Sequence, residues 1–369
     1  MKIIFHIDSL GSGGAQRQIC ALGLGLAARG HQVEFHTYYE LDHFRPVIEA
    51  ANIPIRFTPK RSRFSFAPIC GLISHAKDIE ADAIVAFLRT PAVYAEVAGV
   101  FLKGTKIVAS ERYAIPDPPH SVGYWLTQQF HRLADAITVN SRSSQRAMAA
   151  NFPWMTGKLH CIFNGYHKRV AAPRDGATPG ALELLALASI NRRKDALSLA
   201  KALRICVQER GESVHVQWAG EPTIYGGTCL EQDIVDGYLK AHGLEANWKW
   251  LGLVSDTDAL FSKCDALIHT SRAEGFSNVV AESLLNGTPV IIGRIQDQPE
   301  IVENSQAGLL FDVGNPESIA DAIGQFIALS DGERVLMSRN ARQYAEATLS
   351  IDTMIDRYEA LLSATAEGH

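Results

Sequence analysis

The amino-acid sequence predicts an α/β protein with two Rossmann-like, doubly wound domains that face a cleft. Short apolar, β-branched runs alternate with helix-sized segments along the whole chain, which is typical of parallel βαβ units. The series of runs starts again in the second half of the chain. A segment rich in Pro and Gly, without periodicity, separates the two series.

The first series predicts an amino-terminal domain, residues 1–168. Between its first two runs lies a helical pattern with Ile19, Leu22 and Leu26 on one face, which Gly30 ends. One complete βαβ unit is therefore predicted. The runs expected to form strands are residues 2–7, 32–38, 83–88, 106–109, 136–140 and 159–163.

The second series predicts a carboxyl-terminal domain, residues 183–348. We interpret residues 169–182, with Pro173 and Pro179 among alanines and glycines, as the linker. The last helical stretch lies within residues 349–369 and is expected to pack back across the hinge. The runs expected to form strands are residues 183–188, 214–219, 248–251, 266–270, 289–292 and 309–311, and residues 196–209 are one of the helices between them.

The composition narrows the class of function. The 369 residues are 47% hydrophobic, and 35 Lys and Arg against 40 Asp and Glu give a net charge of −5. No global field favours nucleic acid, which we do not expect as a partner. The apolar start is too short for a signal peptide and Asp8 interrupts it, so we expect a cytoplasmic protein. No His/Asp cluster has metal-ligand spacing, so neither a metal nor a cofactor is expected.

Residues 271–290 carry the clearest chemical pattern. An apolar run leads into a loop, and a helix is predicted to begin near Ser277 or Asn278, both good N-cap residues, and to end at Gly287. Backbone N–H groups from Ser277 to Val279 would then bind a phosphate, and the helix dipole adds to the attraction.

Two carboxylates flank this predicted anion site. Glu274 lies in the loop and Glu282 one turn into the helix. Hydroxyl donors, such as sugars on either side of a diphosphate, would make two carboxylates compatible with an anion between them. From the spacing alone, a solvated loop residue and a helix-surface charge remain equally good interpretations.

The same segment resembles the donor-site motif of the retaining glycosyltransferases of family 4, which have the GT-B fold. It reads Ser-Arg-Ala-Glu-Gly-Phe-Ser-Asn-Val-Val-Ala-Glu-Ser-Leu, and Gly-Thr-Pro-Val-Ile follows. Other elements fall in family order and extend the resemblance over nearly the whole chain. They are Leu10-Gly11-Ser12-Gly13-Gly14-Ala15-Gln16-Arg17, Ser110-Glu111-Arg112, Phe163-Asn164-Gly165 and Gln298-Pro299-Glu300-Ile301-Val302.

The resemblance implies roles for individual residues. Lys194 and Glu274 would be the catalytic residues: Lys194 would neutralise the departing diphosphate, and Glu274 would face the donor sugar. Glu282 would bind the ribose of the nucleotide-sugar donor. Without the resemblance, the sequence around Lys194 favours a lysine on a solvated face. The other positions assigned to substrate binding are Gly13, Gly14, Glu111, Arg112, Gly275, Phe276, Ser277, Asn278 and Val279.

The chain departs from the family pattern beside Lys194. The family usually has an arginine five residues earlier, where this chain has Ser189. Arg192 or Arg193 is our hypothesis for the missing charge, because a guanidinium can bind phosphate from a neighbouring turn.

The amino-terminal domain departs from the pattern as well. Many members carry a catalytic-site histidine there, but Arg89-Thr90-Pro91 follows the run at residues 83–88. His120 and His131 are nearby in sequence, and neither is assigned the role, since a lone histidine is more often structural or solvated.

One compact basic and aromatic run lies in the half that binds acceptor in this family. It contains Lys60, Arg61, Arg63, Phe64 and Phe66. Such a run suits a bilayer surface or a lipid pyrophosphate, so we expect a lipid-linked acceptor and a peripheral contact with the inner face of the membrane. A solvated loop that binds nothing is the alternative.

These observations together predict a function. We expect a metal-independent, retaining hexosyltransferase that moves a sugar from a UDP- or GDP-sugar to a glycan or lipid-linked acceptor in surface polysaccharide or glycolipid assembly. The alternative, prompted by Ser189 and the missing histidine, is a non-catalytic GT-B sugar-nucleotide binder or partner subunit.

Overall fold

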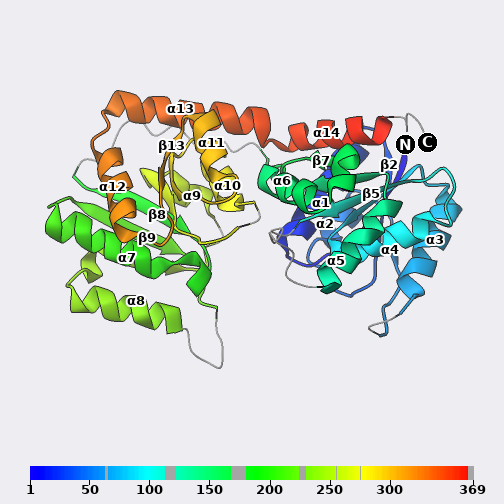
Figure 1. Cartoon of the computed structure of the whole chain (residues 1–369), viewed down its shortest axis with the longest axis horizontal. Coiled ribbons are helices and arrows are strands. Elements are labelled where there is room, and N and C mark those ends of the chain that lie inside the picture. Colours follow the sequence, from blue (N-terminus) through cyan, green and yellow to red (C-terminus); the bar gives the residue numbers. More distant parts are fainter. Residues whose placement is uncertain are drawn as a thin grey trace. The chain divides into compact units, whose positions relative to one another are not determined.

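The computed structural model describes residues 1–62, 65–112, 122–167, 180–223, 230–254, 256–274 and 276–364. The chain forms two compact units, each a parallel sheet covered by helices (Figure 1). Unit 1 comprises Met1–Gly165 and Ser350–His369, and unit 2 comprises Tyr166–Leu349. The predicted fold class of two Rossmann-like α/β domains is confirmed.

Unit 1 contains a seven-stranded parallel sheet in the order β3-β2-β1-β4-β5-β6-β7 among the described residues. Alternate side chains point to opposite faces, so Ile3 and Phe5 join one core and Ile4 the other. The order reverses between β1 and β4. The strands are β1 Lys2–His6, β2 Gln32–Thr37, β3 Ile55–Phe57, β4 Ala83–Phe87, β5 Lys106–Glu111, β6 Ala136–Val139 and β7 Leu159–Cys161.

Helices cover both faces of the unit 1 sheet. On one face α1 packs against the last helix of the chain, α14, whose Tyr358 is fully buried in the same core as Phe5. The helices are α1 Gly14–Ala28, α2 Arg45–Ala50, α3 Ala67–Ile79, α4 Arg89–Gly99, α5 Val122–Gln129, α6 Arg142–Asn151 and α14 Ile351–Ser363, with 3₁₀ turns η1 Phe130–Leu133 and η2 Pro153–Lys158.

Unit 2 contains a six-stranded parallel sheet in the order β10-β9-β8-β11-β12-β13 among the described residues. Here the order reverses between β8 and β11. The fully buried Trp218 stacks on Trp248 in the core. The strands are β8 Leu182–Leu187, β9 Val214–Ala219, β10 Trp248–Gly252, β11 Ala266–His269, β12 Val290–Gly293 and β13 Gly308–Phe311.

The helices of unit 2 alternate with these strands, as the sequence pattern predicts. They are α7 Ala196–Arg204, α8 Leu230–Ala241, α9 Asp258–Phe261, α10 Asn278–Leu285, α11 Gln298–Ser305, α12 Pro316–Ile327 and α13 Asp331–Thr348. Short turns are η3 Arg192–Lys194, η4 Ile205–Glu209 and η5 Glu245–Asn247. The predicted helix at residues 196–209 is thus α7 followed by the π-type turn η4.

Strand β3 was not predicted, since the three residues Ile55–Phe57 are too few for a period-2 pattern. Of the predicted linker, residues 169–182, the part at residues 169–179 lies outside the described residues. Within the described ranges, no helix is both long and apolar enough to cross a membrane.

Candidate donor site

The topology of unit 2 brings two distant sequence motifs together. Strands β8 and β11 are neighbours, and the strand order reverses at this pair. The connections that leave the carboxyl ends of such a pair run to opposite faces of the sheet and open a crevice between them. Turn η3, which carries Lys194, follows β8, and the loop with Glu274 follows β11. The predicted cation and carboxylate therefore meet at this edge.

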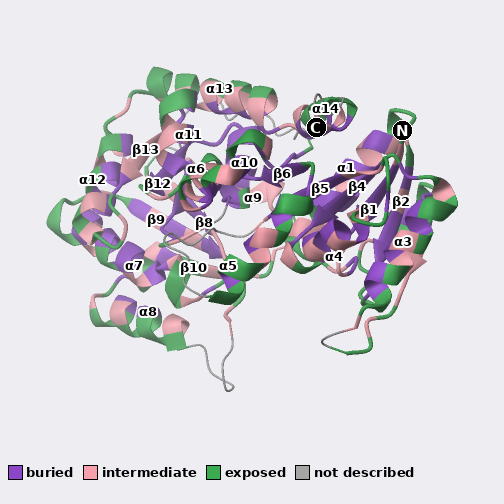
Figure 2. Ribbon diagram, turned by 45° about the vertical axis from the view of Figure 1, so that its right-hand side comes forward, coloured by how far each residue is buried: buried purple, intermediate pink, exposed green. Residues whose placement is uncertain are grey.

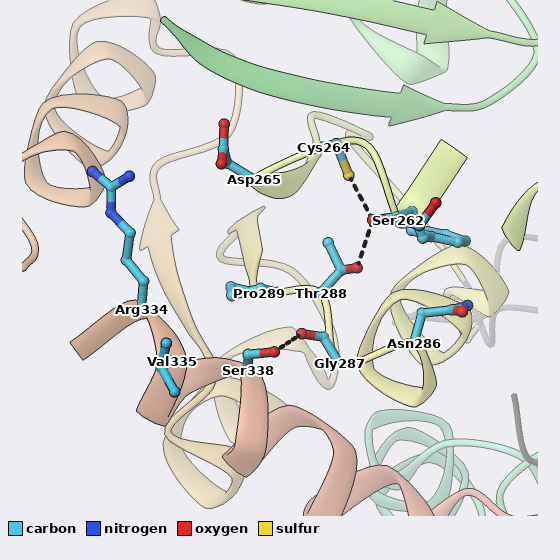
Figure 3. A pocket seen from close by; sticks show the side chains of 11 residues that line it. Ser262, Cys264, Asp265, Asn286, Gly287, Thr288, Pro289, Arg334, Val335 and Ser338 are labelled. Carbon is cyan, nitrogen blue, oxygen red and sulfur yellow. Dashed lines mark hydrogen bonds between the residues drawn. The ribbon is translucent and has the colours of Figure 1, made fainter. Parts of the chain in front are cut away.

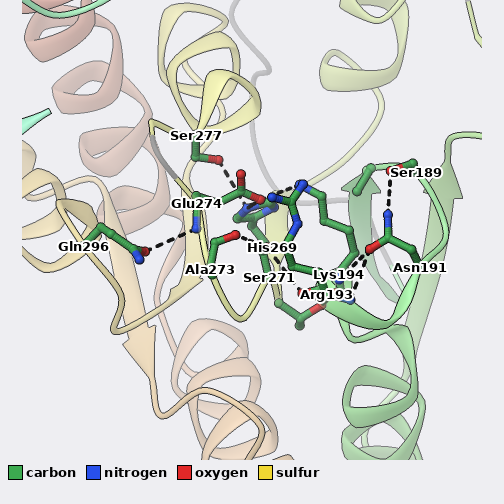
Figure 4. Close-up of polar contacts among 12 residues, drawn as sticks. Ser189, Asn191, Arg193, Lys194, His269, Ser271, Ala273, Glu274, Ser277 and Gln296 are labelled. Carbon is green, nitrogen blue, oxygen red and sulfur yellow. Dashed lines mark hydrogen bonds and ion pairs between the residues drawn. The ribbon is translucent and has the colours of Figure 1, made fainter. Parts of the chain in front are cut away.

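Three side chains form the centre of the candidate donor site (Figure 4). Lys194 Nζ forms an ion pair with Glu274 Oε1, and both side chains are only 13% exposed. The same carboxylate oxygen lies 3.5 Å from Nε2 of the buried His269, the last residue of β11. His269 Nε2 also lies 3.2 Å from the hydroxyl of Ser277. His269 thus links the loop of Glu274 to the start of α10.

Backbone and side-chain hydrogen bonds hold the lysine turn in place. The amide oxygen of Asn191 caps η3 by accepting hydrogen bonds from the backbone N–H groups of Arg193 and Lys194, at 3.1 and 3.3 Å. Thr270 Oγ1 donates to the carbonyl oxygen of Lys194 at 2.8 Å. The turn is therefore anchored both to its own N-cap and to the loop after β11.

The site fixes the charge of its acidic group. Burial alone would raise the pKa of Glu274, but the hydrogen bond with His269 and the ammonium of Lys194 lower it to about 2. Burial lowers the pKa of His269, and the charges of Lys194 and Arg193 act in the same direction against the opposing effect of Glu274. At neutral pH the centre holds a carboxylate, an ammonium and a neutral imidazole.

Helix α10 begins where the sequence predicts. Ser277 is its N-cap residue in extended conformation, but the Ser277 hydroxyl is directed to His269 and does not cap the helix. The next side chain, Asn278, accepts a hydrogen bond from Tyr166 at 2.6 Å through its amide oxygen. Gly287, with φ of +70°, follows the helix end in the left-handed conformation that glycine adopts readily.

The remaining predicted donor-site residues fall on the same two segments. Phe276 and Val279 are buried beside the start of α10, and Glu282 is 8% exposed within it. Gly275 lies outside the described residues. Arg192 and Arg193 are exposed on η3, and Ser189 is exposed two residues after β8.

The predicted residues of unit 1 occupy two different settings. Gly13 and Gly14 begin α1 at the carboxyl end of β1, and a Cβ on Gly13 would lie 2.2 Å from Oε1 of Gln16. Arg112 is turned inward, where its guanidinium donates to Asn164 and to the hydroxyl of Tyr358 at 2.7 and 2.6 Å. Its contact with substrate stays a prediction.

Glu111 ends β5 and its side chain is fully buried. It accepts a hydrogen bond from Gln128 at 3.2 Å and lies 3.3 Å from Nε2 of His131, whose Nδ1 is 2.5 Å from Glu96. Although burial opposes it, the two carboxylates raise the pKa of His131 to about 9. His131 is therefore a charged group inside unit 1, paired on both sides. A substrate contact for Glu111 stays a prediction.

A cavity in unit 2 lies away from the groups of the candidate donor site (Figure 3). Its lining includes Cys264 and Asp265, directly before β11, and Thr288, shortly before β12. It therefore lies at the amino edge of the sheet, opposite Glu274. Thr288 Oγ1 donates to the carbonyl oxygen of Phe261 at 3.3 Å there.

His269 is the residue of this site that the sequence interpretation missed. It lies within a run that was predicted only as an apolar strand. A polar residue at the end of a buried parallel strand, directly before a functional loop, is the signal that identifies it.

Comparisons with known proteins identify the family. The model for glycosyltransferase family 4 matches residues 12–168, and the model for glycosyl transferases group 1 matches residues 174–344. The chain therefore belongs to glycosyltransferase family 4, and the resemblance inferred from its motifs is confirmed.

Individual relatives are distant. The lipopolysaccharide core biosynthesis glycosyltransferase LpsE of Rhizobium meliloti is 26% identical over 33% of this chain, and the match spans only 36% of LpsE. The N-acetylgalactosamine-N,N'-diacetylbacillosaminyl-diphospho-undecaprenol 4-alpha-N-acetylgalactosaminyltransferase of Campylobacter jejuni is 24% identical over 98% of this chain and 99% of its own length. The crystal structure of HepE from Anabaena in complex with UDP superimposes with a TM-score of 0.82 at 21% identity, over 99% of this chain and 100% of HepE.

Proposed function

We propose that the protein transfers a sugar, with retention at the anomeric carbon, from a nucleotide-diphosphate-sugar to a glycan or lipid-linked acceptor in surface polysaccharide or glycolipid assembly. The observation that carries this proposal is the cluster of Lys194, Glu274 and His269 beside the start of α10. Family membership and the name of the Campylobacter relative, which contains a diphospho-undecaprenol acceptor, support it.

The donor diphosphate would bind between η3 and α10. Backbone N–H groups in the first turn of a helix point outward and favour an anion. The ammonium of Lys194 would leave Glu274 for the diphosphate, since two negative charges replace one. Glu274 would then accept hydrogen bonds from hydroxyls of the donor sugar, and Glu282 from the ribose.

The charge states give each group a definite part in the reaction. Leaving-group departure places negative charge on the β-phosphate oxygen, and a fixed ammonium stabilises that charge most in the transition state. Before the donor binds, the pKa of Glu274 is about 2, so the donor sugar would meet a carboxylate that accepts hydrogen bonds. The acceptor hydroxyl would attack from the face that the diphosphate leaves, and its proton would pass to the departing phosphate oxygen. The bond from the sugar to the phosphate breaks as the bond to the acceptor oxygen forms.

For the acceptor we propose the carboxyl edge of the unit 1 sheet. Lys60 Nζ lies 5.2 Å from the ring centroid of Tyr94, 5.6 Å from that of Tyr38 and 6.0 Å from that of Tyr39. Aromatic faces that hold a cation also stack on sugar rings. The lipid-linked pyrophosphate predicted from the sequence would bind Lys60, at the cytoplasmic face of a membrane.

The rest of the predicted basic run contributes less. Arg61 is exposed, Phe66 is 74% exposed directly before α3, and Arg63 and Phe64 lie outside the described residues. The membrane contact predicted for this run therefore remains a separate hypothesis.

The test uses the purified protein with a panel of nucleotide-sugars, beginning with UDP-sugars because HepE was crystallised with UDP. Enzymatic function predicts release of the nucleoside diphosphate and transfer to polyprenyl-diphosphate-linked acceptors. Donor-dependent thermal stabilisation without any turnover, with every acceptor offered, would instead support the non-catalytic partner.

A further inference from the structure

Arg89 begins helix α4 at the carboxyl end of β4, where the strand order of unit 1 reverses. The helices that follow the two strands at this point, α1 after β1 and α4 after β4, pack on opposite faces of the sheet. Strands β4 and β5 are themselves buried over nearly their whole length (Figure 2). Since ligands of such sheets bind in the crevice that the reversal opens, the residues that follow these strands are the ones that can meet a substrate.

The turn before Arg89 is held by the neighbouring strand. Leu88 donates its backbone N–H to the carbonyl oxygen of Ser110 on β5, at 3.0 Å. The φ of Leu88 is +77°, which is strained for a residue other than glycine, and such a turn persists where the surrounding structure fixes it. Arg89 is thereby placed beside Glu111, the last residue of β5.

A carboxylate and an aromatic ring hold the guanidinium of Arg89. Its Nε lies 3.8 Å from Glu111 Oε1, and its central carbon lies 4.7 Å from the ring centroid of Tyr124. Although burial opposes it, the contact with His131 and the charge of Arg89 lower the pKa of Glu111, which is therefore a carboxylate. The distance of 3.8 Å is nevertheless too long for a hydrogen bond.

The guanidinium keeps its hydrogen-bond donors available. Among the described residues, the buried Nε of Arg89 has no hydrogen-bond partner, and the terminal nitrogens have none either and are accessible. An arginine that only neutralises a carboxylate commonly directs two N–H groups at it. Buried donors are nearly always paired in proteins, so the unpaired Nε indicates a partner that the chain itself does not supply.

We infer that Arg89 binds an oxyanion of the acceptor, a phosphate or a carboxylate, at the carboxyl edge of the unit 1 sheet. A guanidinium presents a planar pair of donors that matches either group. A second cation reaches the same helix, since Tyr94 of α4 lies 5.2 Å from Lys60 Nζ. This inference rests on the proposed function, because it names the group of the acceptor that unit 1 recognises. It also gives Glu111, which is itself fully buried, a part in substrate binding through Arg89.

The first experiment detects the oxyanion without any turnover. The full-length protein, isotope-labelled at arginine and saturated with UDP to occupy the donor site, is titrated with inorganic pyrophosphate and, separately, with glucuronate. The NMR signal of the Arg89 Nε–H group, assigned by its absence in Arg89→Gln, is expected to shift with at least one of them. A larger shift with pyrophosphate identifies a phosphate of the acceptor, and a larger shift with glucuronate identifies an acidic sugar. A signal that neither probe moves would overturn the inference.

The second experiment measures steady-state kinetics with a polyprenyl-diphosphate-linked acceptor. Arg89→Gln is expected to raise the KM for this acceptor about tenfold or more and to leave the KM for the nucleotide-sugar unchanged, because a charge-assisted hydrogen bond to the acceptor alone is lost. Arg89→Lys keeps the charge without the planar pair of donors and should restore part of the loss. A merely structural arginine would lower the amount of active protein without raising one KM selectively.

Arg132→Gln is the matched control. Arg132 also lies over an aromatic ring, that of Trp154 at 4.3 Å, but its Nε donates to Gln129. This variant should keep the acceptor KM of the wild type. Equal changes in Arg89→Gln and Arg132→Gln, or a change in the donor KM alone, would overturn the inference and leave the proposed transferase function intact. If the wild type transfers no sugar, the proposed function fails, and the NMR titration still decides whether Arg89 binds an oxyanion.

Discussion

Lys194 and Glu274 form an ion pair across 80 positions of the chain, between the loops that follow β8 and β11. In the proposed mechanism the two charges act separately, the ammonium on the diphosphate of the donor and the carboxylate on its sugar. Donor binding would therefore exchange one ion pair for two new contacts. This exchange makes both residues testable by substitution.

Replacing Lys194 by Ala should lower turnover by about 10²- to 10³-fold, as expected when a group that stabilises developing charge is lost. Donor affinity should fall less, because the ammonium acts mainly in the transition state. Steady-state kinetics with saturating donor measures both effects. Lys201→Ala, an exposed lysine on α7, is the control and should behave as the wild type. Equal losses in the two variants would remove Lys194 from the mechanism.

The ionised state of Glu274 should appear in the dependence of stability on pH. Its pKa is lowered to about 2 in the folded protein, against an ordinary value of 4.5, so its contribution to stability is present above pH 4.5 and disappears as the pH falls toward 2. Glu274→Gln should lack this contribution. Chemical denaturation of both proteins at several pH values measures it, and parallel curves through this window would contradict the assignment.

His269 should act as a positioning residue for Glu274. His269→Leu keeps the side chain apolar and buried but removes the hydrogen bond, so the pKa of Glu274 should rise and the acidic limb of kcat/KM should move to higher pH. His269→Gln, which can donate to the carboxylate, should restore part of the shift. A merely structural role would lower the amount of active protein without moving the limb.

Arg193 is the better of the two candidates for the charge missing at Ser189. Its positive charge helps to lower the pKa of His269, which lies within the donor site. Arg193→Ala should raise the KM for the donor several-fold, and Arg192→Ala should change it little. If neither substitution alters turnover or KM while Lys194→Ala abolishes activity, the hypothesis that an arginine of η3 replaces the family residue is wrong.

Buried histidines should place the stability optimum of unit 1 near neutral pH. Burial lowers the pKa of His6 to about 4, and burial also lowers that of His36, to about 2. Below pH 6.5 these histidines bind protons in the unfolded chain but stay neutral in the folded protein. Each therefore lowers the free energy of unfolding by about 1.4 kcal/mol per pH unit, until the pH reaches its folded pKa.

The pKa of His131 is shifted in the opposite direction, so its effect on stability appears on the alkaline side. Its folded pKa of about 9 exceeds its ordinary value, so its stabilising contribution is complete below pH 6.5 and disappears as the pH rises through 9. Thermal unfolding followed from pH 4 to pH 10 should show two losses of stability. One occurs as the pH falls below about 6.5, and the other as the pH rises from about 6.5 through about 9. His131→Gln should remove the alkaline loss alone. An unchanged alkaline limb in that variant would contradict a charged His131.

The alternation of apolar runs was sufficient to predict the fold class, because strands buried on both faces leave a continuous apolar signal. The start of α10 was also predictable from local sequence, because Ser277 and Asn278 are residue types that favour the N-cap position. Pairing between β8 and β11 is a long-range property, so the sequence alone did not bring Lys194 beside Glu274. The family resemblance indicated that both residues belong to one site, and the topology of unit 2 shows their contact.

Other features depend on which side of a helix faces the core. The sequence did not indicate that the carboxylate of Glu111 lies among Gln128, His131 and Arg89, and its predicted contact with substrate stays a prediction. Helical periodicity identifies a side of α5 but does not say which side is buried, and here polar residues point inward.

The central claim is that Lys194 and Glu274 hold a nucleotide-sugar for transfer with retention. It is tested most directly by NMR of the first sugar product that the purified protein forms from its preferred nucleotide-sugar, with acceptor or with water. We expect a product with the anomeric configuration of the donor, formed by the wild type and nearly absent with Lys194→Ala. An inverted product, or equal rates for the two proteins, would contradict it.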